Sequence, residues 1–127
     1  MDFELNEIQL AVQETFKKFV DEKVKPVAAE IDEKKEYPYE LFREVGNLGF
    51  FGMRYPEEVG GNGMDTISYG LALTELARGS LSLAAACMMQ SLMGTYFLYR
   101  FGNDEIREDY FRPALLGEKI GSICMTE

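Results

Sequence analysis

Apolar residues near the N-terminus recur at intervals of three and four, the spacing that lines one face of an α-helix. Asn6 and Gln9 stand at the start of this pattern with the spacing of a capping box, in which two side chains satisfy two backbone amides. The pattern predicts a first helix whose inner face is made of Ile8, Val12, Phe16, Phe19, Val20 and Val24.

Further helical segments follow, separated by proline, glycine and capping residues. Pro26 suits the first turn of a second short helix, through about Asp32. Pro38 opens a third helix, which Gly49 can end in a left-handed turn. The inward positions of the third helix are Leu41, Phe42, Val45 and Leu48. The fourth helix has Asp65 as its cap, and its residues spaced for burial are Ile67, Leu71 and Leu76. A sixth helix has Asn103 as its cap, and Pro113 interrupts or kinks it.

The fifth helix, from about residue 83 to residue 101 with Ser80 and Ser82 as candidate caps, is apolar on nearly every side. A helix that is apolar all round is buried all round. A chain of 127 residues rarely encloses so long a helix, so part of its surface should meet another domain, a subunit or a ligand. Met88, Met89 and Met93 are more typical of core filling, but this excess of apolar surface favours a pocket.

The pattern changes after the last helix. Residues 119–127 alternate β-branched and other side chains, which predicts a short strand without a partner strand in this chain. The sequence therefore indicates an all-α fold of about six helices that ends in this strand.

Charge and composition exclude several classes of function. The net charge of −9 argues against a nucleic acid or an anionic membrane as the main partner. Because the chain contains no histidine, we expect neither a metal site nor a Ser-His or Cys-His nucleophile. The two cysteines predict buried thiols in a reducing compartment. No uninterrupted apolar run of membrane-spanning length occurs and no signal peptide is visible, so we expect a cytoplasmic protein without a membrane span.

The least regular segment runs from Tyr55 to Gly63 and contains one proline and three glycines. It lacks the spacing of a phosphate-binding loop. Taken alone, it is best interpreted as a connector; the alternative is a loop that glycine shapes for close packing on another domain.

Five blocks resemble the acyl-CoA dehydrogenase family in the family's own order and spacing. Leu48-Gly49 with Pro56–Gly63 resembles its LG…PEEyGGlG signature, and Glu75–Ser80 resembles its E-L-A-R segment. Phe101–Glu105 and Gly117–Gly121 are similar to its F-G-t-e-e and G-E-x-I-G segments. Met125-Thr126-Glu127 looks like the opening of its T-E-P-x-x-G-S-D flavin motif.

The resemblance implies an N-terminal domain, here residues 1–117, shaped as an orthogonal helical bundle. Residues 118–127 would then start the connection into a middle β-barrel domain, which a C-terminal four-helix bundle follows. The parent enzyme would use FAD to introduce an α,β double bond into an acyl-CoA thioester in fatty-acid or amino-acid catabolism. It would form a homotetramer and pass electrons to an electron-transferring flavoprotein.

The resemblance also implies roles for residues of this chain. Ile123, Met125 and Thr126 would contact the flavin, and Met88, Ser91, Leu92 and Thr95 would line the acyl tail. From the residues alone, Ser91 and Thr95 could do no more than hydrogen-bond back to their own helix. The catalytic base would be a glutamate of the C-terminal bundle, so we expect this chain alone to be an inactive fragment. Two alternatives are a domain of a related flavin oxidase or monooxygenase, and a stand-alone helical interaction module.

Overall fold

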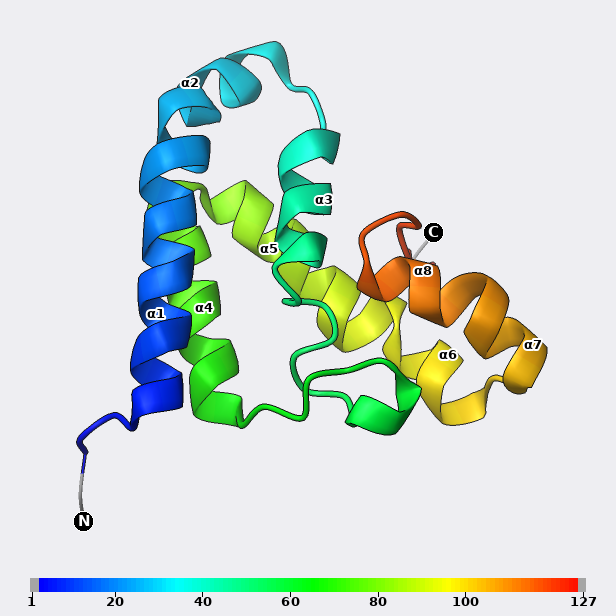
Figure 1. Cartoon of the computed structure of the whole chain (residues 1–127). Coiled ribbons are helices and arrows are strands. Elements are labelled where there is room, and N and C mark those ends of the chain that lie inside the picture. The colour runs from blue at the N-terminus through cyan, green and yellow to red at the C-terminus, as the bar shows by residue number, and fades with distance from the viewer. Residues whose placement is uncertain (1–2, 126–127) are drawn as a thin grey trace.

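The computed structural model describes residues 3–125, and within that range the fold is entirely helical (Figure 1). Five helical stretches make up the domain. They are α1 (Glu7–Phe19) running into α2 (Lys25–Lys34), α3 (Tyr39–Asn47), α4 (Thr66–Gly79), α5 (Leu81–Met89) running into α6 (Tyr96–Phe101), and α7 (Asp104–Ile106) running into α8 (Arg112–Leu115). A short 3₁₀ turn, Glu57–Val59, lies in the connection between α3 and α4.

Three π-helical turns join helices of the described residues, and the first of them accounts for five stretches where the sequence predicted about six helices. Pro26 does not start a separate helix, because the turn Val20–Val24 joins α1 to α2, and Arg107–Phe111 joins α7 to α8 ahead of Pro113 in the same way. Proline cannot donate to the carbonyl four residues back, and its ring crowds that carbonyl. A wider turn just before the proline leaves room for the ring and keeps the helix continuous. The third π turn, Gln90–Gly94, joins α5 to α6.

Several predicted helix ends are confirmed. The reciprocal capping box of Asn6 and Gln9 opens α1, and Asp65 and Ser80 cap α4 and α5 through their side chains. Gly49 follows α3 with a φ of 85°, a left-handed conformation that glycine adopts without strain.

The predicted strand at residues 119–127 is wrong for the part that the structure describes. No strand occurs among residues 3–125, and residues 120–125 follow an irregular path. A strand requires a neighbouring strand to pair its backbone, and the described part of the chain offers none.

Three apolar side chains predicted to face inward are exposed instead. Ile8 is 63% exposed, Ile67 is 56% exposed and Leu48 is 37% exposed. Gln9 takes the inner position at this end of α1, where its side-chain amide donates to a carboxylate oxygen of Asp65 at 2.9 Å. Because the buried face of α1 passes through Gln9, Val12, Phe16 and Phe19, the neighbouring Ile8 is turned outward.

The prediction that both thiols are buried is half right. Cys87 is buried in the core, which raises the pKa of its thiol to about 12, whereas Cys124 is exposed.

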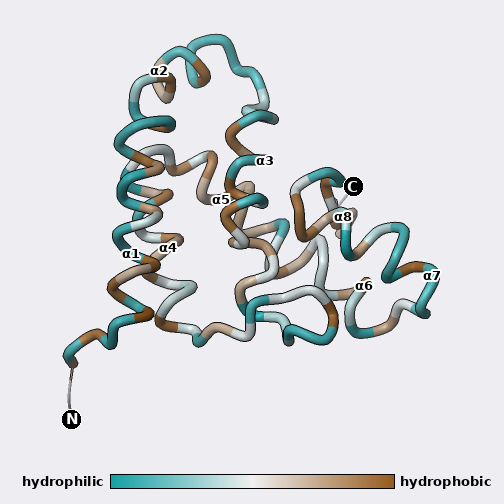
Figure 2. The backbone as a smooth tube through the Cα atoms, in the orientation of Figure 1, coloured by the Kyte–Doolittle hydropathy of each residue, from teal (hydrophilic) through white to brown (hydrophobic). Residues whose placement is uncertain are grey.

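The core lies where α1, α4 and α5 pack together with the connection that follows α3 (Figures 1 and 2). Phe50, Phe51, Met53 and Tyr55 in that connection are all buried, so it is part of the core and not only a surface connector. Phe16 and Tyr69, from α1 and α4, contact the Phe50 ring with centroid distances of 5.8 and 4.9 Å. Burial of such rings dominates the hydrophobic stabilisation of a small domain.

An ion-pair network joins α4 to the π turn that follows α1. Arg78 donates to Asp21 at 2.8 Å and to Glu75 at 2.7 Å, and Lys25 lies 2.8 Å from Asp21. The hydrogen bonds that Arg78 and Lys25 donate to Asp21 lower the pKa of this carboxyl to about 2.

We predict an acid-sensitive contribution from Asp21. Because its pKa in the folded chain lies below its ordinary value of 3.8, the network stabilises the fold above about pH 4 and is lost as the pH falls toward 2. Asp21→Asn should therefore flatten the decline in unfolding free energy over this range, measured by urea unfolding at several pH values. Asp32→Asn, at an exposed carboxylate outside the ion pairs of the described residues, is the control. The same acid decline in wild type and Asp21→Asn would contradict the assignment.

Two glycines of α4 give a second prediction with opposite signs. A methyl group on Gly79 would lie 2.6 Å from Cγ1 of Val20 and 3.0 Å from Cγ1 of Val24, whereas one on Gly70 would meet nothing within 4 Å. Gly79→Ala should cost about 1–3 kcal/mol through overpacking. Gly70→Ala should gain about 0.5–1 kcal/mol through helix propensity. Chemical denaturation of both variants measures the two effects, and a stabilising Gly79→Ala would show that α4 does not pack this closely.

Candidate functional site

The helix Leu81–Phe101 buries polar side chains and exposes large apolar ones. Gln90, Ser91 and Thr95 are turned inward, with 1%, 7% and 0% of their surface exposed. The large apolar residues on the opposite side are exposed, although a helix in a globular domain normally buries its apolar face. These exposed residues are Leu81, Met89, Leu92, Met93, Tyr96, Phe97 and Phe101.

The inward hydroxyl groups are satisfied by two buried tyrosines. The Tyr55 hydroxyl lies 2.8 Å from Oγ1 of Thr95, and the Tyr69 hydroxyl lies 2.6 Å from Oγ of Ser91. Oγ1 of Thr95 also donates to the carbonyl of Gln90 at 3.0 Å, the carbonyl that accepts the Thr95 amide in the π turn. Burial raises the pKa of both tyrosines, so they remain neutral hydrogen-bonding groups over the physiological range.

The outward face is apolar and carries no charge ahead of Arg100, near the end of the helix. The sequence contains no Asp, Glu, Lys or Arg between Arg78 and Arg100. The expectation that this helix is not enclosed by its own chain is thus confirmed. Isolated exposed apolar residues are ordinary, but a contiguous row along one helix is typical of a surface that another body covers.

An open cavity of about 480 Å³ begins beside this face. Four residues of the helix form one side of it: Ser91, Leu92, Tyr96 and Tyr99. Arg54 and Pro56, from the connection between α3 and α4, form the other side. The cavity therefore combines an aromatic wall with one cationic side chain.

The residues predicted to line an acyl tail divide between the two faces of the helix. Leu92 is exposed and Met88 is half-buried, so both are accessible. The hydroxyls of Ser91 and Thr95 are bonded to the two tyrosines inside the domain, although Ser91 also lines the open cavity beside Leu92. Met89 and Met93 on the outward face are more exposed than Met88, Ser91 and Thr95. Helical periodicity alone did not show which face of the helix would point outward.

The residues predicted to contact a flavin lie in or beyond the last described segment. Ile123 is half-buried and Met125 is 77% exposed, while Thr126 lies outside the described residues. Among the described residues, no hydrogen bond engages the backbone of residues 122–125. Backbone amides and carbonyls without a partner inside a fold are groups that a ligand or a neighbouring domain can engage.

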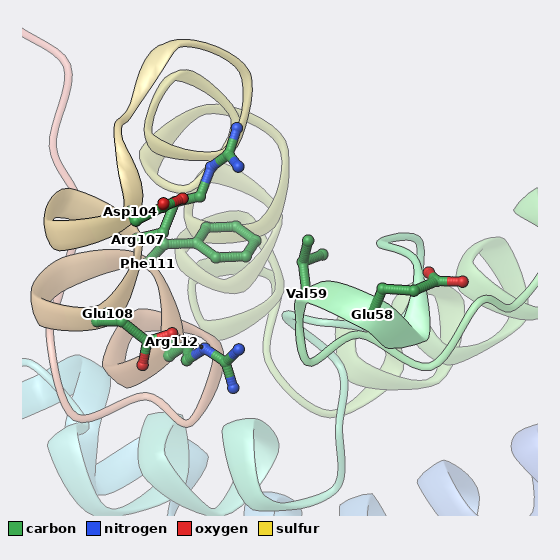
Figure 3. A pocket seen from close by; sticks show the side chains of 7 residues that line it. All are labelled: Glu58, Val59, Asp104, Arg107, Glu108, Phe111 and Arg112. Carbon is green, nitrogen blue, oxygen red and sulfur yellow. Dashed lines mark ion pairs between the residues drawn. The ribbon is translucent and has the colours of Figure 1, made fainter.

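A second cavity, of about 180 Å³, lies between α7–α8 and the 3₁₀ turn (Figure 3). Two of its charged side chains pair with each other, Arg112 with Glu108 at 2.8 Å, and Arg107 donates to the carbonyl of Tyr99 at 3.0 Å. Phe111 forms its floor and Val59 faces it across the gap. This cavity is small and charged, unlike the apolar face of the helix Leu81–Phe101.

The helix Leu81–Phe101 has 21 residues and is long and apolar enough to cross a membrane by length and composition. A core helix of a globular domain passes the same test. Its hydrogen-bonded row of Gln90, Ser91 and Thr95, buried against α4 and the connection after α3, is typical of a core helix.

Comparison with known proteins agrees with this geometry. The sequence model of the acyl-CoA dehydrogenase N-terminal domain matches residues 6–118. Benzylmalonyl-CoA dehydrogenase of Aromatoleum aromaticum is 58% identical over 127 residues, which cover 100% of this chain and 34% of that protein.

Solved structures show the same fold. Glutaryl-coenzyme A dehydrogenase bound to glutaryl-CoA superposes with a TM-score of 0.87 and 34% identity, over 95% of this chain and 31% of that one. Butyryl-CoA dehydrogenase from Megasphaera elsdenii superposes with a TM-score of 0.84 and 31% identity, over 94% of this chain and 32% of that one.

The chain spans about a third of the length of the relatives that it matches. These matches agree with the dehydrogenase prediction and not with an unrelated interaction module. From the match over residues 6–118 and the shared fold, the chain belongs to the acyl-CoA dehydrogenase family, as its N-terminal helical domain.

Proposed function

We propose that this domain supplies one wall of the acyl-tail pocket, and part of the flavin-binding surface, to an FAD-dependent acyl-CoA dehydrogenase. The observation that carries the proposal is the helix Leu81–Phe101, which buries polar side chains and exposes large apolar ones. Its polar side chains are hydrogen-bonded inside the domain, so the uncharged apolar face is left for a ligand or another domain. An acyl tail, which is apolar and uncharged, matches such a wall.

We assign the wall to Met89, Leu92 and Met93, with Met88 beside them. Ser91 and Thr95 support it from behind, because their hydroxyls fix the rotation of the helix about its axis. Methionine sulfur makes favourable contacts with aromatic rings. Together with the 58% identity to a dehydrogenase named for benzylmalonyl-CoA, this favours an acyl group that carries an aromatic ring.

The flavin-binding part of the proposal rests on the segment that follows Gly121. Its free backbone groups, with Ile123, Met125 and Thr126, would hold the polar edge of the flavin ring. When bound, FAD would accept the hydride from the β-carbon of the thioester. This domain would orient the acyl tail and exclude water from it.

The α-proton requires a base from another part of the parent enzyme. Glu75 is the one buried carboxylate among the described residues, and its pairing with Arg78 occupies it in the fold. We also propose that the parent is a cytoplasmic homotetramer of fatty-acid or amino-acid catabolism. Its electron acceptor would be an electron-transferring flavoprotein.

The direct test uses a full-length protein that contains this domain. The purified protein should carry FAD, and anaerobic addition of an aryl-substituted acyl-CoA should bleach the flavin absorbance near 450 nm, on the order of one flavin per thioester. A protein that lacks flavin, or whose flavin no acyl-CoA reduces, would contradict the proposal. Faster reoxidation by oxygen than by the electron-transferring flavoprotein would favour an oxidase.

The 127-residue chain alone should not oxidise acyl-CoA even with added FAD. It contains no histidine, and its buried glutamate is committed to an ion pair. The assay is dye reduction with acyl-CoA, FAD and the pure chain, compared with a reaction without protein. Turnover above that background would place a catalytic base within this domain.

A charge on the proposed wall should weaken binding of the acyl tail. Met89→Glu replaces a side chain that is 44% exposed in the isolated domain with a carboxylate facing the tail. Loss of about 1.5–3 kcal/mol of apolar contact corresponds to roughly 10–100-fold weaker binding of an aryl acyl-CoA to the full-length enzyme. Leu10→Glu, at a side chain 50% exposed on α1, is the matched control and should leave binding unchanged. If both variants bind the aryl acyl-CoA with equal affinity, Met89 does not contact the acyl tail.

A further inference from the structure

Gln90 binds the C-terminal segment with both ends of its side-chain amide. Its Nε2 donates to the carbonyl of Ala114 at 2.9 Å and to the carbonyl of Lys119 at 2.8 Å. Its Oε1 accepts the backbone amide of Gly121 at 2.8 Å. The Gln90 side chain itself is 1% exposed, so an amide atom that loses its partner there is costly.

Two glycines bring the same segment into backbone contact with the helix. A methyl group on Gly121 would lie 2.5 Å from Cα of Gly94, and one on Gly94 would lie 2.9 Å from Cα of Gly121. No side chain fits between the two backbones. Residues 119–121 are thereby fixed on the π turn Gln90–Gly94.

This turn also carries the proposed acyl wall. Met89 directly precedes Gln90, and Leu92 and Met93 lie within the turn. The segment that leaves the turn at Gly121 leads to Ile123 and Met125, the proposed flavin contacts. One buried amide thus connects the acyl wall to the flavin segment.

We infer that Gln90 is a positioning residue, which sets the place of the flavin segment relative to the acyl wall. The inference rests on the proposed function, since it assigns a purpose to a contact within that site. Gln90 faces neither ligand. It acts through residues 119–121, and the purely structural alternative is that it only fastens the end of the domain.

The test compares two variants of the full-length flavoenzyme. Gln90→Met keeps the length of the side chain and removes its three hydrogen bonds to the segment. Gln9→Met, the matched control, makes the same replacement at a buried glutamine of α1, whose side-chain amide donates to Asp65 and lies outside the proposed site. For each protein, we would measure the melting temperature, the dissociation constant of FAD, the visible flavin spectrum with and without acyl-CoA, and the flavin midpoint potential.

Both variants should melt at lower temperature than the wild type. Only Gln90→Met should also weaken FAD binding by about tenfold or more and alter the spectral change that acyl-CoA produces. If Gln90→Met lowers the melting temperature but leaves the dissociation constant of FAD, the flavin spectrum and the midpoint potential as they are in Gln9→Met, the positioning role is wrong.

Should Gln90→Met fail to fold, Gly121→Ala gives the same comparison. It pushes the segment away from Gly94 by steric contact and keeps the Gln90 side chain. Unchanged flavin binding, spectrum and potential in Gly121→Ala would overturn the inference. Failure of the proposed function is distinguishable, because the wild-type protein itself would then lack FAD or fail to respond to acyl-CoA.

Discussion

The fold depends on the buried hydrogen bonds along the inner face of the helix Leu81–Phe101. A buried polar group without a partner costs about 1–3 kcal/mol, so Gln90, Ser91 and Thr95 tolerate few rotations of this helix. Tyr69 of α4 and Tyr55 of the connection after α3 receive the two hydroxyls. Once these bonds fix the rotation, Met89, Leu92 and Met93 are directed outward, and the domain acquires an apolar wall.

The same constraint gives the surrounding segments their roles. The connection after α3 is anchored in the core by Phe50 and Phe51 and brings Tyr55 to the helix. On the opposite side, Gln90 holds the segment after α8 against the π turn. Figure 1 shows the consequence: α5–α6 crosses the domain between the α1–α4 pair and the α7–α8 pair.

Local chemistry made much of this fold predictable from the sequence. The capping box of Asn6, the cap at Asp65 and the left-handed Gly49 each depend on a few neighbouring residues. The joining of helices through π turns was not predicted, because proline signals an interruption whether or not the helix continues. Gln90 also escaped prediction, since its partners Ala114, Lys119 and Gly121 lie 24 to 31 residues away. A single amide within an apolar run was the one signal available.

The central claim is that the inner hydrogen bonds leave the outer face of this helix to contact an acyl tail. The most direct measurement is an experimental structure of a full-length protein containing this domain, with FAD and a bound aryl acyl-CoA. The account predicts that Met89, Leu92 or Met93 lies within about 4 Å of the acyl group. An acyl group bound elsewhere, with this face covered only by another domain or by a second copy of the chain, would contradict it.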